Sequence, residues 1–411
     1  MLLIKNIGTL QTPVGSFPHG GEKQGENLKL HNAAILVENG IIKAITEGGI
    51  LPEGCENAQV IDAEGALVTP GLIDCHTHMV FGGYRQGEIP LKLRGASYLD
   101  ILRAGGGILD TVGKTRSASQ EELYEKTREF LDEMLENGVT TAESKSGYGL
   151  DLETEIKQLR VNKALNESHP LELVSTFLGA HAIPEEYKGR PNEYIDFLCD
   201  VVLPAVKAEN LADYVDVFCE DSVFDVAQSE KMLRAGQALG LRARIHADEI
   251  EEIGGAVLSG ELGAVSAEHL IATGEKGMAS MAKGGVIADL LPATSFYLNK
   301  TFAPAWRMIE LGIPVAIASD FNPGSCPSLN LQLAMSMGYI KYRMTPEEVL
   351  SAVTVNAACS CGLEQKVGTL EVGKQADIVI WNAPDMEMLV YRFGSNLART
   401  VIKKGTVVIE N

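Results

Sequence analysis

Short apolar runs at both ends of the chain alternate with glycine-rich turns, such as those at 38–40 and 47–49. Seven such runs stand at 33–37, 41–45, 60–61, 376–381, 389–391, 400–402 and 407–409. This pattern is typical of small antiparallel sheets. Because both ends share it, we expect them to pair into one composite β-sandwich domain built from residues 1–65 and 362–411.

Residues 66–361 follow a different pattern, in which apolar runs alternate with amphipathic helical stretches. Ser119 and Glu122 form a capping box, and Asn137 with Gly138 ends the helix that the box begins. The apolar stripe of this helix consists of Leu123, Thr127, Phe130, Leu131, Met134 and Leu135. A second helix is predicted to begin at 345–348, where a threonine cap precedes proline and two glutamates.

Eight apolar runs in this middle region have the length of buried strands. They are 71–75, 140–144, 173–178, 215–219, 242–245, 264–267, 286–291 and 315–319. Strands that alternate with helices imply a parallel sheet. Eight such strands close into a barrel without exposed edges. The sequence therefore predicts an α/β fold, a TIM-like (β/α)8 barrel over residues 66–361.

Composition limits the classes of partner. The 411 residues include 35 basic and 55 acidic side chains, and the formal net charge of −20 disfavours nucleic acids and anionic membranes. A small anionic substrate would need a specific Arg or Lys. The seven cysteines form no CxxC pair, and neither an export signal nor an apolar run long enough for a membrane span is visible. We expect a soluble, cytoplasmic protein.

Histidines gather where the predicted strands end. Five of the eight histidines stand there, namely His76, His78, His181, His246 and His269. Active sites of such barrels lie at the carboxyl ends of the strands. A single histidine beside a strand is usually a packed structural residue, but five at one rim favour a functional site.

Four of the rim residues can form a metal shell. His76 and His78 lie two residues apart and project to the same side, and His246 and Asp320 can close the shell from across the barrel. Three imidazoles and one carboxylate suit one Zn²⁺ or Fe²⁺ ion. The alternative, that the two nearby histidines merely pack, is disfavoured by His246 and Asp320 at corresponding strand ends.

Such an ion would lower the pKa of a bound water to about 7, and a base would still have to take its proton. Glu249, three residues after His246, is the best-placed carboxylate, and His269 could hydrogen-bond the water or polarise the scissile group. Asp320, as a predicted ligand of the ion, would lie next to the same water. Either Glu249 or His269 could instead orient a metal ligand.

Two segments resemble the amidohydrolase superfamily: PGLIDCHTH at 70–78 and VGTLEVGKQADI at 367–378. More specific segments are VFGGYR at 80–85, GGGI at 105–108, KSGYGL at 145–150, FLGAH at 177–181 and DFNPGS at 320–325. Together they resemble the imidazolonepropionase family over essentially the whole chain. That family opens 4-imidazolone-5-propanoate to N-formimidoyl-L-glutamate in histidine degradation.

The resemblance implies the same four metal ligands and a set of substrate-binding residues. That set comprises Arg85, Tyr148, His181, Glu249, Asn322, Gly324 and Ser325. A guanidinium can clamp the propionate of the substrate through two hydrogen bonds. Tyr148 and His181 would hold the ring and the carboxylate. The resemblance also implies a homodimer.

Three points stay open at the level of sequence. A deaminase of the same superfamily, acting on guanine or a cytosine-type base, would have a similar shell, and some barrel relatives serve only as scaffolds. Lys145 is the nearest lysine that carbamylation could turn into a bridge between two metals, although one metal is favoured. Tyr84 and Glu220 have no assigned role.

Overall fold

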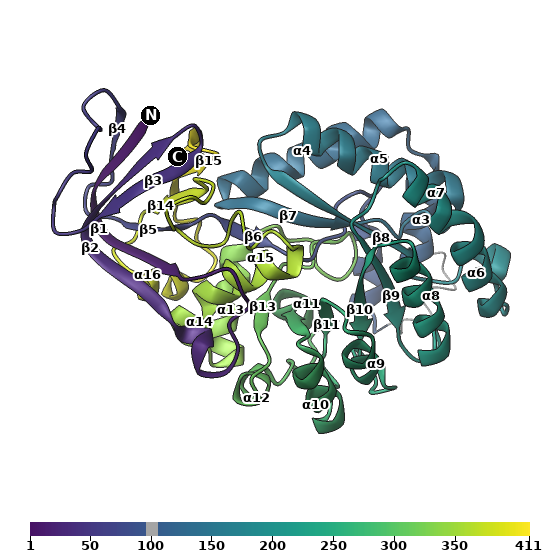
Figure 1. Cartoon of the computed structure of the whole chain (residues 1–411). Helices are drawn as coiled ribbons and strands as arrows, with labels where there is room; N and C mark the ends of the chain where they lie inside the picture. Colours follow the sequence, from purple (N-terminus) through teal and green to yellow (C-terminus); the bar gives the residue numbers. More distant parts are fainter. Residues whose placement is uncertain (96–105) are drawn as a thin grey trace.

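Two sheets organise the chain in the computed structural model, which describes residues 1–95 and 106–411 (Figure 1). Gly105, the first residue of the 105–108 motif, lies outside the described residues. One sheet contains eight parallel strands: β6 (Leu72–Asp74), β7 (Val139–Lys145), β8 (Glu172–Ala180), β9 (Tyr214–Cys219), β10 (Arg242–Ala247), β11 (Ser266–His269), β12 (Ile287–Leu290) and β13 (Val315–Ile317). Each coincides with one of the eight predicted runs, so the predicted TIM-like barrel is confirmed.

The first and last barrel strands meet beyond their carboxyl ends. Thr77 and Phe321 form a parallel bridge. The N–H of Asp320 donates to the carbonyl of His76 at 3.0 Å, and the N–H of His78 donates to the carbonyl of Phe321 at 2.8 Å. The barrel therefore closes through the backbone of the segments that carry three of the predicted metal ligands.

Helices cover the outside of the barrel (Figure 1). Those between and around the barrel strands are α1 (Ile89–Leu93), α3 (Ile108–Ser117), α4 (Gln120–Glu136), α5 (Leu152–Ser168), α6 (Pro191–Phe197), α7 (Leu203–Ala208), α8 (Val226–Ala238), α9 (Gly255–Leu262), α10 (Glu275–Gly284), α11 (Pro292–Tyr297), α12 (Ala305–Glu310), α13 (Leu331–Tyr342), α14 (Pro346–Ala352) and α15 (Val355–Cys361). Both predicted helices are confirmed. α4 and α14 each begin with a complete capping box, on Ser119 and Thr345 respectively.

The second sheet joins the two ends of the chain. Its strands are β1 (Leu2–Pro13), β2 (Asn27–Glu38), β3 (Ile41–Thr46), β4 (Gln59–Asp62), β5 (Leu67–Pro70), β14 (Ile378–Trp381), β15 (Ala398–Lys403) and β16 (Thr406–Glu410). Their order is β16-β15-β14-β5-β1-β2-β3, and β4 pairs with the start of β1. The two ends of the chain share one continuous sheet that branches at β1. It extends past residue 65, the expected boundary, because β5 pairs with β14 and β1.

One predicted strand of the composite domain is wrong. Residues 389–391 belong to the helix α16 (Met386–Tyr391), which the Asp385 side chain caps by accepting from the N–H of Met388. Leu389 and Val390 are buried on one side of this helix. A three-residue apolar run fits one turn of an amphipathic helix as well as it fits a strand.

The interior of the barrel contains an ionic layer where such barrels usually hold branched aliphatic side chains. Its fully buried members are Glu143, Lys145, Asp216, Arg244, Glu268 and Asp289. Buried charges persist only when they are paired. These six groups come from β7, β9, β10, β11 and β12, so the layer ties most of the barrel strands to one another beneath the predicted site.

No helix within residues 1–95 and 106–411 is long and apolar enough to cross a membrane. The seven cysteines are all free thiols.

Candidate active site

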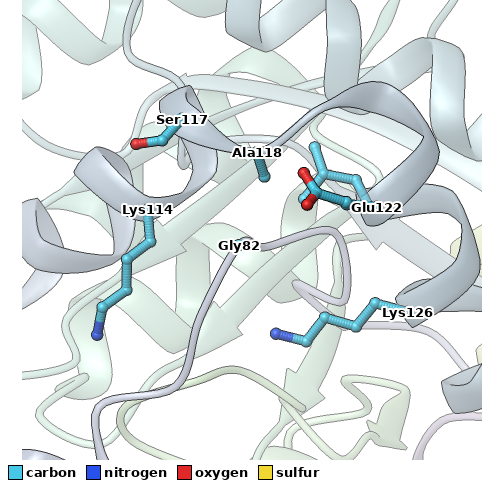
Figure 2. A pocket seen from close by; sticks show the side chains of 7 residues that line it. Gly82, Lys114, Ser117, Ala118, Glu122 and Lys126 are labelled. Atoms are coloured by element: carbon cyan, nitrogen blue, oxygen red, sulfur yellow. The ribbon is translucent and has the colours of Figure 1, made fainter.

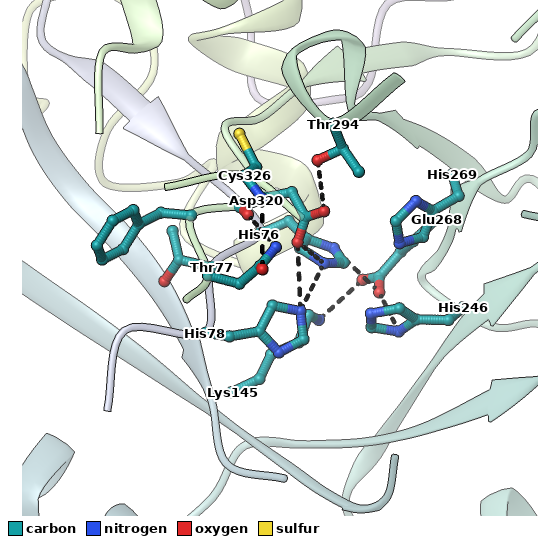
Figure 3. A network of polar contacts seen from close by, with 12 residues as sticks. His76, Thr77, His78, Lys145, His246, Glu268, His269, Thr294, Asp320 and Cys326 are labelled. Carbon is teal, nitrogen blue, oxygen red and sulfur yellow. Dashed lines mark hydrogen bonds and ion pairs between the residues drawn. The ribbon is translucent and has the colours of Figure 1, made fainter. Parts of the chain in front are cut away.

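Four polar side chains converge at the carboxyl ends of the barrel strands (Figure 3). The Nε2 atoms of His76 and His78 lie 3.2 Å apart, and Oδ1 of Asp320 lies 3.5 Å and 3.4 Å from them. One ring nitrogen of His246 lies within 4.8 Å of a ring nitrogen of each of the other two histidines. All four residues are buried. The structure thus brings together the four residues that the sequence singled out.

The spacing of these atoms fits a tetrahedral metal ion. Ligand atoms at 2.0–2.1 Å from Zn²⁺ in a tetrahedral arrangement would lie about 3.3 Å from one another. The three contacts among His76, His78 and Asp320 match this edge length. Nε2 of His246 is buried and has no hydrogen-bond partner among the described residues, as expected of a nitrogen whose partner is an ion.

Carboxylates hold the opposite nitrogens of two of these histidines. Oε2 of Glu268 lies 3.1 Å from Nδ1 of His76 and 3.0 Å from Nδ1 of His246, and Oδ2 of Asp216 lies 3.0 Å from the same His246 atom. Such carboxylates fix the orientation of a ligating imidazole and increase its basicity. The sequence analysis assigned no role to either carboxylate. The available signal was a charged residue inside one predicted buried strand, Asp216, and another directly after the end of a second, Glu268.

Asp320 is held in the same manner. Its Oδ2 accepts a hydrogen bond of 2.6 Å from the hydroxyl of Thr294 on α11, which leaves Oδ1 facing His76 and His78. The backbone of Asp320 has a φ of 53°, an uncommon value for a residue other than glycine. Burial favours the neutral acid, but hydrogen bonds from His76 and His78 outweigh it and hold the pKa of Asp320 well below its usual range.

Lys145 lies below the histidines and contacts three carboxylates. Its Nζ is 3.0 Å from oxygens of Glu143, Asp216 and Glu268. Burial favours the neutral amine, but the three negative charges outweigh it and raise the pKa of Lys145 above its ordinary value. Carbamylation requires a neutral amine, so the geometry disfavours the metal-bridging role considered for this lysine.

Glu249 and His269 lie beside each other at the rim. Nε2 of His269 is 3.7 Å from one Glu249 oxygen, and Nζ of Lys300 is 4.0 Å from the other. The His269 ring lies 5.2 Å from the His246 ring and 5.7 Å from the His76 ring, between centroids. The structure therefore places both predicted proton-handling residues next to the four converging ligands.

The open question of Glu220 is answered by its contacts. Its two carboxylate oxygens accept hydrogen bonds from the backbone N–H groups of Asp221, Ile250 and Glu251, at 2.8–3.1 Å. Only 1% of Glu220 is exposed. Because two of these donors directly follow Glu249, the carboxylate of Glu220 holds the loop on which Glu249 stands.

Tyr148 and His181 lie next to His78. The His181 ring stacks on the His78 ring with 5.0 Å between centroids, and the Tyr148 ring lies 5.4 Å from that of His181. Nδ1 of His181 lies 3.1 Å from the Gly147 carbonyl. Burial lowers the pKa of His181 well below its usual value, so Nδ1 donates to that carbonyl and Nε2 is left as an acceptor. Burial raises the pKa of Tyr148, so its phenol stays protonated.

Glu155 on α5 organises the loop that carries Tyr148. This fully buried carboxylate accepts from the backbone N–H groups of Gly147, Gly149 and Leu150 at 2.8–3.1 Å. Sequence reasoning missed it, since the residue is only one of several glutamates at the start of a helix.

Arg85 packs directly on the loop after β13. A Cβ built on Gly324 would lie 1.3 Å from Nη2 of the Arg85 side chain. The backbone N–H of Arg85 donates to the Pro323 carbonyl at 3.2 Å. Oδ1 of Asn322 accepts from the N–H groups of Gly324 and Ser325 at 2.9 and 2.7 Å. The structure thus unites Arg85, Asn322, Gly324 and Ser325 in one corner, where Asn322 shapes the loop and Gly324 leaves space for the guanidinium.

Tyr84 belongs to an aromatic cluster outside the converging ligands. The centroid of its ring lies 5.0 Å from that of Phe81. Nζ of Lys126 lies 4.3 Å from the Phe81 centroid and 4.9 Å from the Tyr84 centroid. Lys126 lines a surface pocket of about 420 Å³ together with Gly82 and Lys114, and Figure 2 shows Gly82 between the two lysines. Tyr84 therefore supports the segment that leads to Arg85.

Fold and site together define the class of the protein: an α/β barrel with a buried cluster of three imidazoles and one carboxylate, suited to a divalent metal, at its carboxyl rim. Two family models, both described as amidohydrolase family, match residues 59–93 and 227–408. The structure of 5-methylcytosine deaminase from Klebsiella pneumoniae superposes with a TM-score of 0.75 at 18% identity, covering 100% of this chain and 98% of that one. Escherichia coli guanine deaminase gives 0.73 at 14% identity, covering 100% and 99%. At such identities the likeness concerns the fold alone.

The chain belongs to the imidazolonepropionase family of amidohydrolases. It is 49% identical to the imidazolonepropionase of Alkaliphilus metalliredigens, covering 100% of this chain and 98% of that protein. The Geobacillus kaustophilus imidazolonepropionase is 47% identical, with 100% and 98% covered. That of Streptococcus pyogenes serotype M3 is 50% identical, with 92% of each chain covered. The family resemblance drawn from the motifs is thereby confirmed.

Proposed function

We propose that this protein hydrolyses 4-imidazolone-5-propanoate to N-formimidoyl-L-glutamate, a step of histidine degradation. The observation that carries the proposal is the near-full-length similarity, at 47–50% identity, to proteins named imidazolonepropionase. The converging His76, His78, His246 and Asp320 support a hydrolytic reaction, and the guanidinium of Arg85 in the neighbouring corner supports an anionic substrate.

His76, His78, His246 and Asp320 would hold one divalent ion, Zn²⁺ or Fe²⁺. Their donor set of nitrogen and carboxylate oxygen suits either metal. The bound ion supplies Lewis acidity that brings the ionisation of a water molecule close to neutral pH. The remaining chemistry belongs to the side chains around it.

Glu249 takes a proton from the attacking water and returns it to the ring nitrogen that leaves. In this step water adds to the carbonyl carbon of the ring, the amide-like C–N bond breaks, and the products are a carboxylate and the terminal nitrogen of the formimidoyl group, which takes the proton. His269, 3.7 Å from Glu249, hydrogen-bonds the water or the carbonyl oxygen and orients it. Asp320 is both a metal ligand and a neighbour of the water.

Two groups of residues hold the substrate. Arg85 binds the propionate through its guanidinium. Tyr148 donates a hydrogen bond from its phenol, and Nε2 of His181 accepts one from the ring. Asn322, Gly324 and Ser325 form the corner that positions Arg85 and contacts the carboxylate.

The test is a direct assay of the metal-replete protein. Loss of the ultraviolet absorbance of 4-imidazolone-5-propanoate, with N-formimidoyl-L-glutamate identified by mass spectrometry, is the expected result. Release of ammonia from guanine or cytosine, without ring opening of the imidazolone, would instead identify a deaminase. If the protein is inactive and retains only a small fraction of one equivalent of metal, it is a scaffold.

Two further expectations accompany this function. The resemblance to the family supports a homodimer, which sedimentation or light scattering would test. The free thiols support a cytoplasmic location, which fractionation of the producing cell would test.

A further inference from the structure

The ionic layer beneath the converging histidines centres on one ammonium group. Nζ of Lys145 lies 3.0 Å from Oε1 of Glu143, 3.0 Å from Oδ2 of Asp216 and 3.0 Å from Oε1 of Glu268. All four side chains are fully buried, and the carboxylates come from three different strands: β7, β9 and β11. The Lys145 side chain thus links three alternate strands of the barrel, because β8 and β10 lie between them in the sheet.

Two of these carboxylates also contact metal-ligand candidates. Glu268 turns Oε1 toward Lys145 and Oε2 toward Nδ1 of both His76 and His246. Asp216 shares Oδ2 between Lys145 and Nδ1 of His246, while its Oδ1 accepts from the N–H groups of His246 and Val217. Every oxygen of the two carboxylates therefore has a fixed neighbour (Figure 3 shows Lys145, Glu268 and the histidines).

A carboxylate has two equivalent oxygens and a rotatable bond. It holds an imidazole in one orientation only if its other contacts hold the carboxylate itself. Arg244 adds one contact, 3.2 Å from Oε1 of Glu268, but its other contacts are Asp289 and two carbonyl groups. Apart from His246, which the two carboxylates hold, Lys145 is the only basic side chain among the described residues that contacts both Asp216 and Glu268.

We propose that Lys145 is a positioning residue for the metal centre: its ammonium group fixes Asp216 and Glu268, which in turn hold His76 and His246 with their Nε2 atoms toward the ion. The inference rests on the proposed function, because it presupposes that these histidines bind a metal. It assigns to Lys145 a role in metal affinity, in contrast to a role in catalysis or in folding alone.

The test compares two buried lysines. In Lys145→Met a side chain of similar length replaces the ammonium; Lys403→Met is the matched control, because Lys403 is also buried and pairs with Asp377 and Glu172, far from the histidines. Each protein is stripped of metal and titrated with Zn²⁺ against a chromophoric chelator, and its melting temperature is measured with and without Zn²⁺. We expect Lys145→Met to lose about 10- to 100-fold in Zn²⁺ affinity, and Lys403→Met to melt at a lower temperature with unchanged affinity.

A charge-balanced variant separates positioning from folding. Glu143→Gln combined with Lys145→Met removes one buried charge of each sign, so the double variant should melt at a higher temperature than Lys145→Met while its Zn²⁺ affinity stays low. Wild-type affinity in either variant would overturn the proposal. So would the failure of both to fold while Lys403→Met folds, because the ion pairs would then serve the barrel alone. Absence of Zn²⁺ binding by the wild type would overturn the metal site itself.

Discussion

The guanidinium of Arg85 occupies the space that a side chain at position 324 would fill, since a Cβ on Gly324 would lie 1.3 Å from Nη2 and 1.9 Å from Cζ of Arg85. The two residues come from opposite ends of the barrel sequence, after β6 and after β13. Nε of Arg85 lies 3.6 Å from Oε1 of Glu88. The Arg85 guanidinium, which we propose binds the propionate of the substrate, can therefore lie here only because residue 324 has no side chain.

Gly324→Ala is therefore expected to impair substrate binding by displacing Arg85. The backbone at Gly324 is not in the left-handed region, so alanine itself is compatible with the loop. We expect kcat/KM to fall by about 10- to 100-fold, mainly because KM rises. This is the effect expected when roughly one pair of charge-assisted hydrogen bonds to the substrate is lost. Steady-state kinetics with 4-imidazolone-5-propanoate would measure it.

Gly113→Ala provides the control for that variant. Gly113 lies within α3, and a Cβ there would meet no atom within 4 Å. Its kinetics should equal those of the wild type. Equal KM values for Gly324→Ala and the wild type would contradict the role given to the Arg85 corner.

Glu249→Gln should reduce turnover without releasing the metal. Glutamine keeps the shape of the side chain but cannot accept the proton of the water, and a lost general base costs about 10²- to 10⁴-fold in kcat. Metal content by elemental analysis should stay equal to that of the wild type, because Glu249 is not among the converging ligands. A parallel loss of metal and activity would show that Glu249 acts on the ligands instead.

Glu220→Gln should weaken catalysis by loosening the loop behind Glu249. One oxygen of Glu220 becomes an NH₂ group, which cannot accept the N–H bonds of Ile250 or Glu251. We expect kcat to fall several-fold while KM changes little, together with faster amide exchange at 250 and 251. Unchanged exchange at these two amides would rule out the positioning role.

The sequence was sufficient to predict all eight barrel strands, because each one falls in a short, largely apolar run that a helical stretch separates from the next. It failed for β1, where Asn6 has a φ of 53° and the pairing with β2 shifts register between Ile4 and Ile7. That irregularity interrupts the alternation that identifies a half-buried strand. It also failed at 389–391, where three apolar residues could not distinguish a strand from a helical turn.

The converging ligands could be predicted from the sequence because they stand at strand ends, where the fold forces them together. The residues that support them could not. Asp216 and Glu268 lie inside strands, and Glu155 and Glu220 bind backbone N–H groups whose positions depend on loop geometry. A charged residue within a buried strand signals a partner, but only the tertiary structure identifies Lys145 as that partner.

Metal binding should release a proton from His246. Burial favours the neutral ring, but Asp216 and Glu268 outweigh it and raise the pKa of His246 to about 10 in the metal-free protein. At pH 7 the ring is therefore protonated, and an ion must displace that proton. Apparent Zn²⁺ affinity should rise about tenfold per pH unit from pH 7 to 9 for one proton. Calorimetry in buffers of different ionisation enthalpy would count the protons, and a value of zero at pH 7 would contradict this expectation.

Glu172 should contribute to stability in a pH-dependent way, because it joins the barrel to the end-strand sheet. Its carboxylate on β8 contacts Lys366 and, at 3.5 Å, Lys403 on β15. Burial favours the neutral acid, but Lys403 and Lys366 outweigh it and lower the pKa of Glu172. A depressed pKa stabilises the fold above the unfolded-state pKa of about 4.3, and this contribution is lost as the pH falls through the folded-state pKa.

Glu172→Gln is thus expected to lower the free energy of unfolding by about 1–3 kcal/mol at pH 7, the usual value of hydrogen bonds to charged groups. The difference from the wild type should begin to shrink below about pH 4.3, where the unfolded-state carboxylate becomes protonated, and should be lost as the pH falls through the lower folded-state pKa. Urea unfolding of both proteins at pH 7, 5 and 4 would measure it. The control is Glu209→Gln, which breaks an exposed pair with Arg160 and should leave stability unchanged at every pH. A difference for Glu172→Gln that stayed constant at all three pH values would mean that packing, and not charge, accounts for the effect.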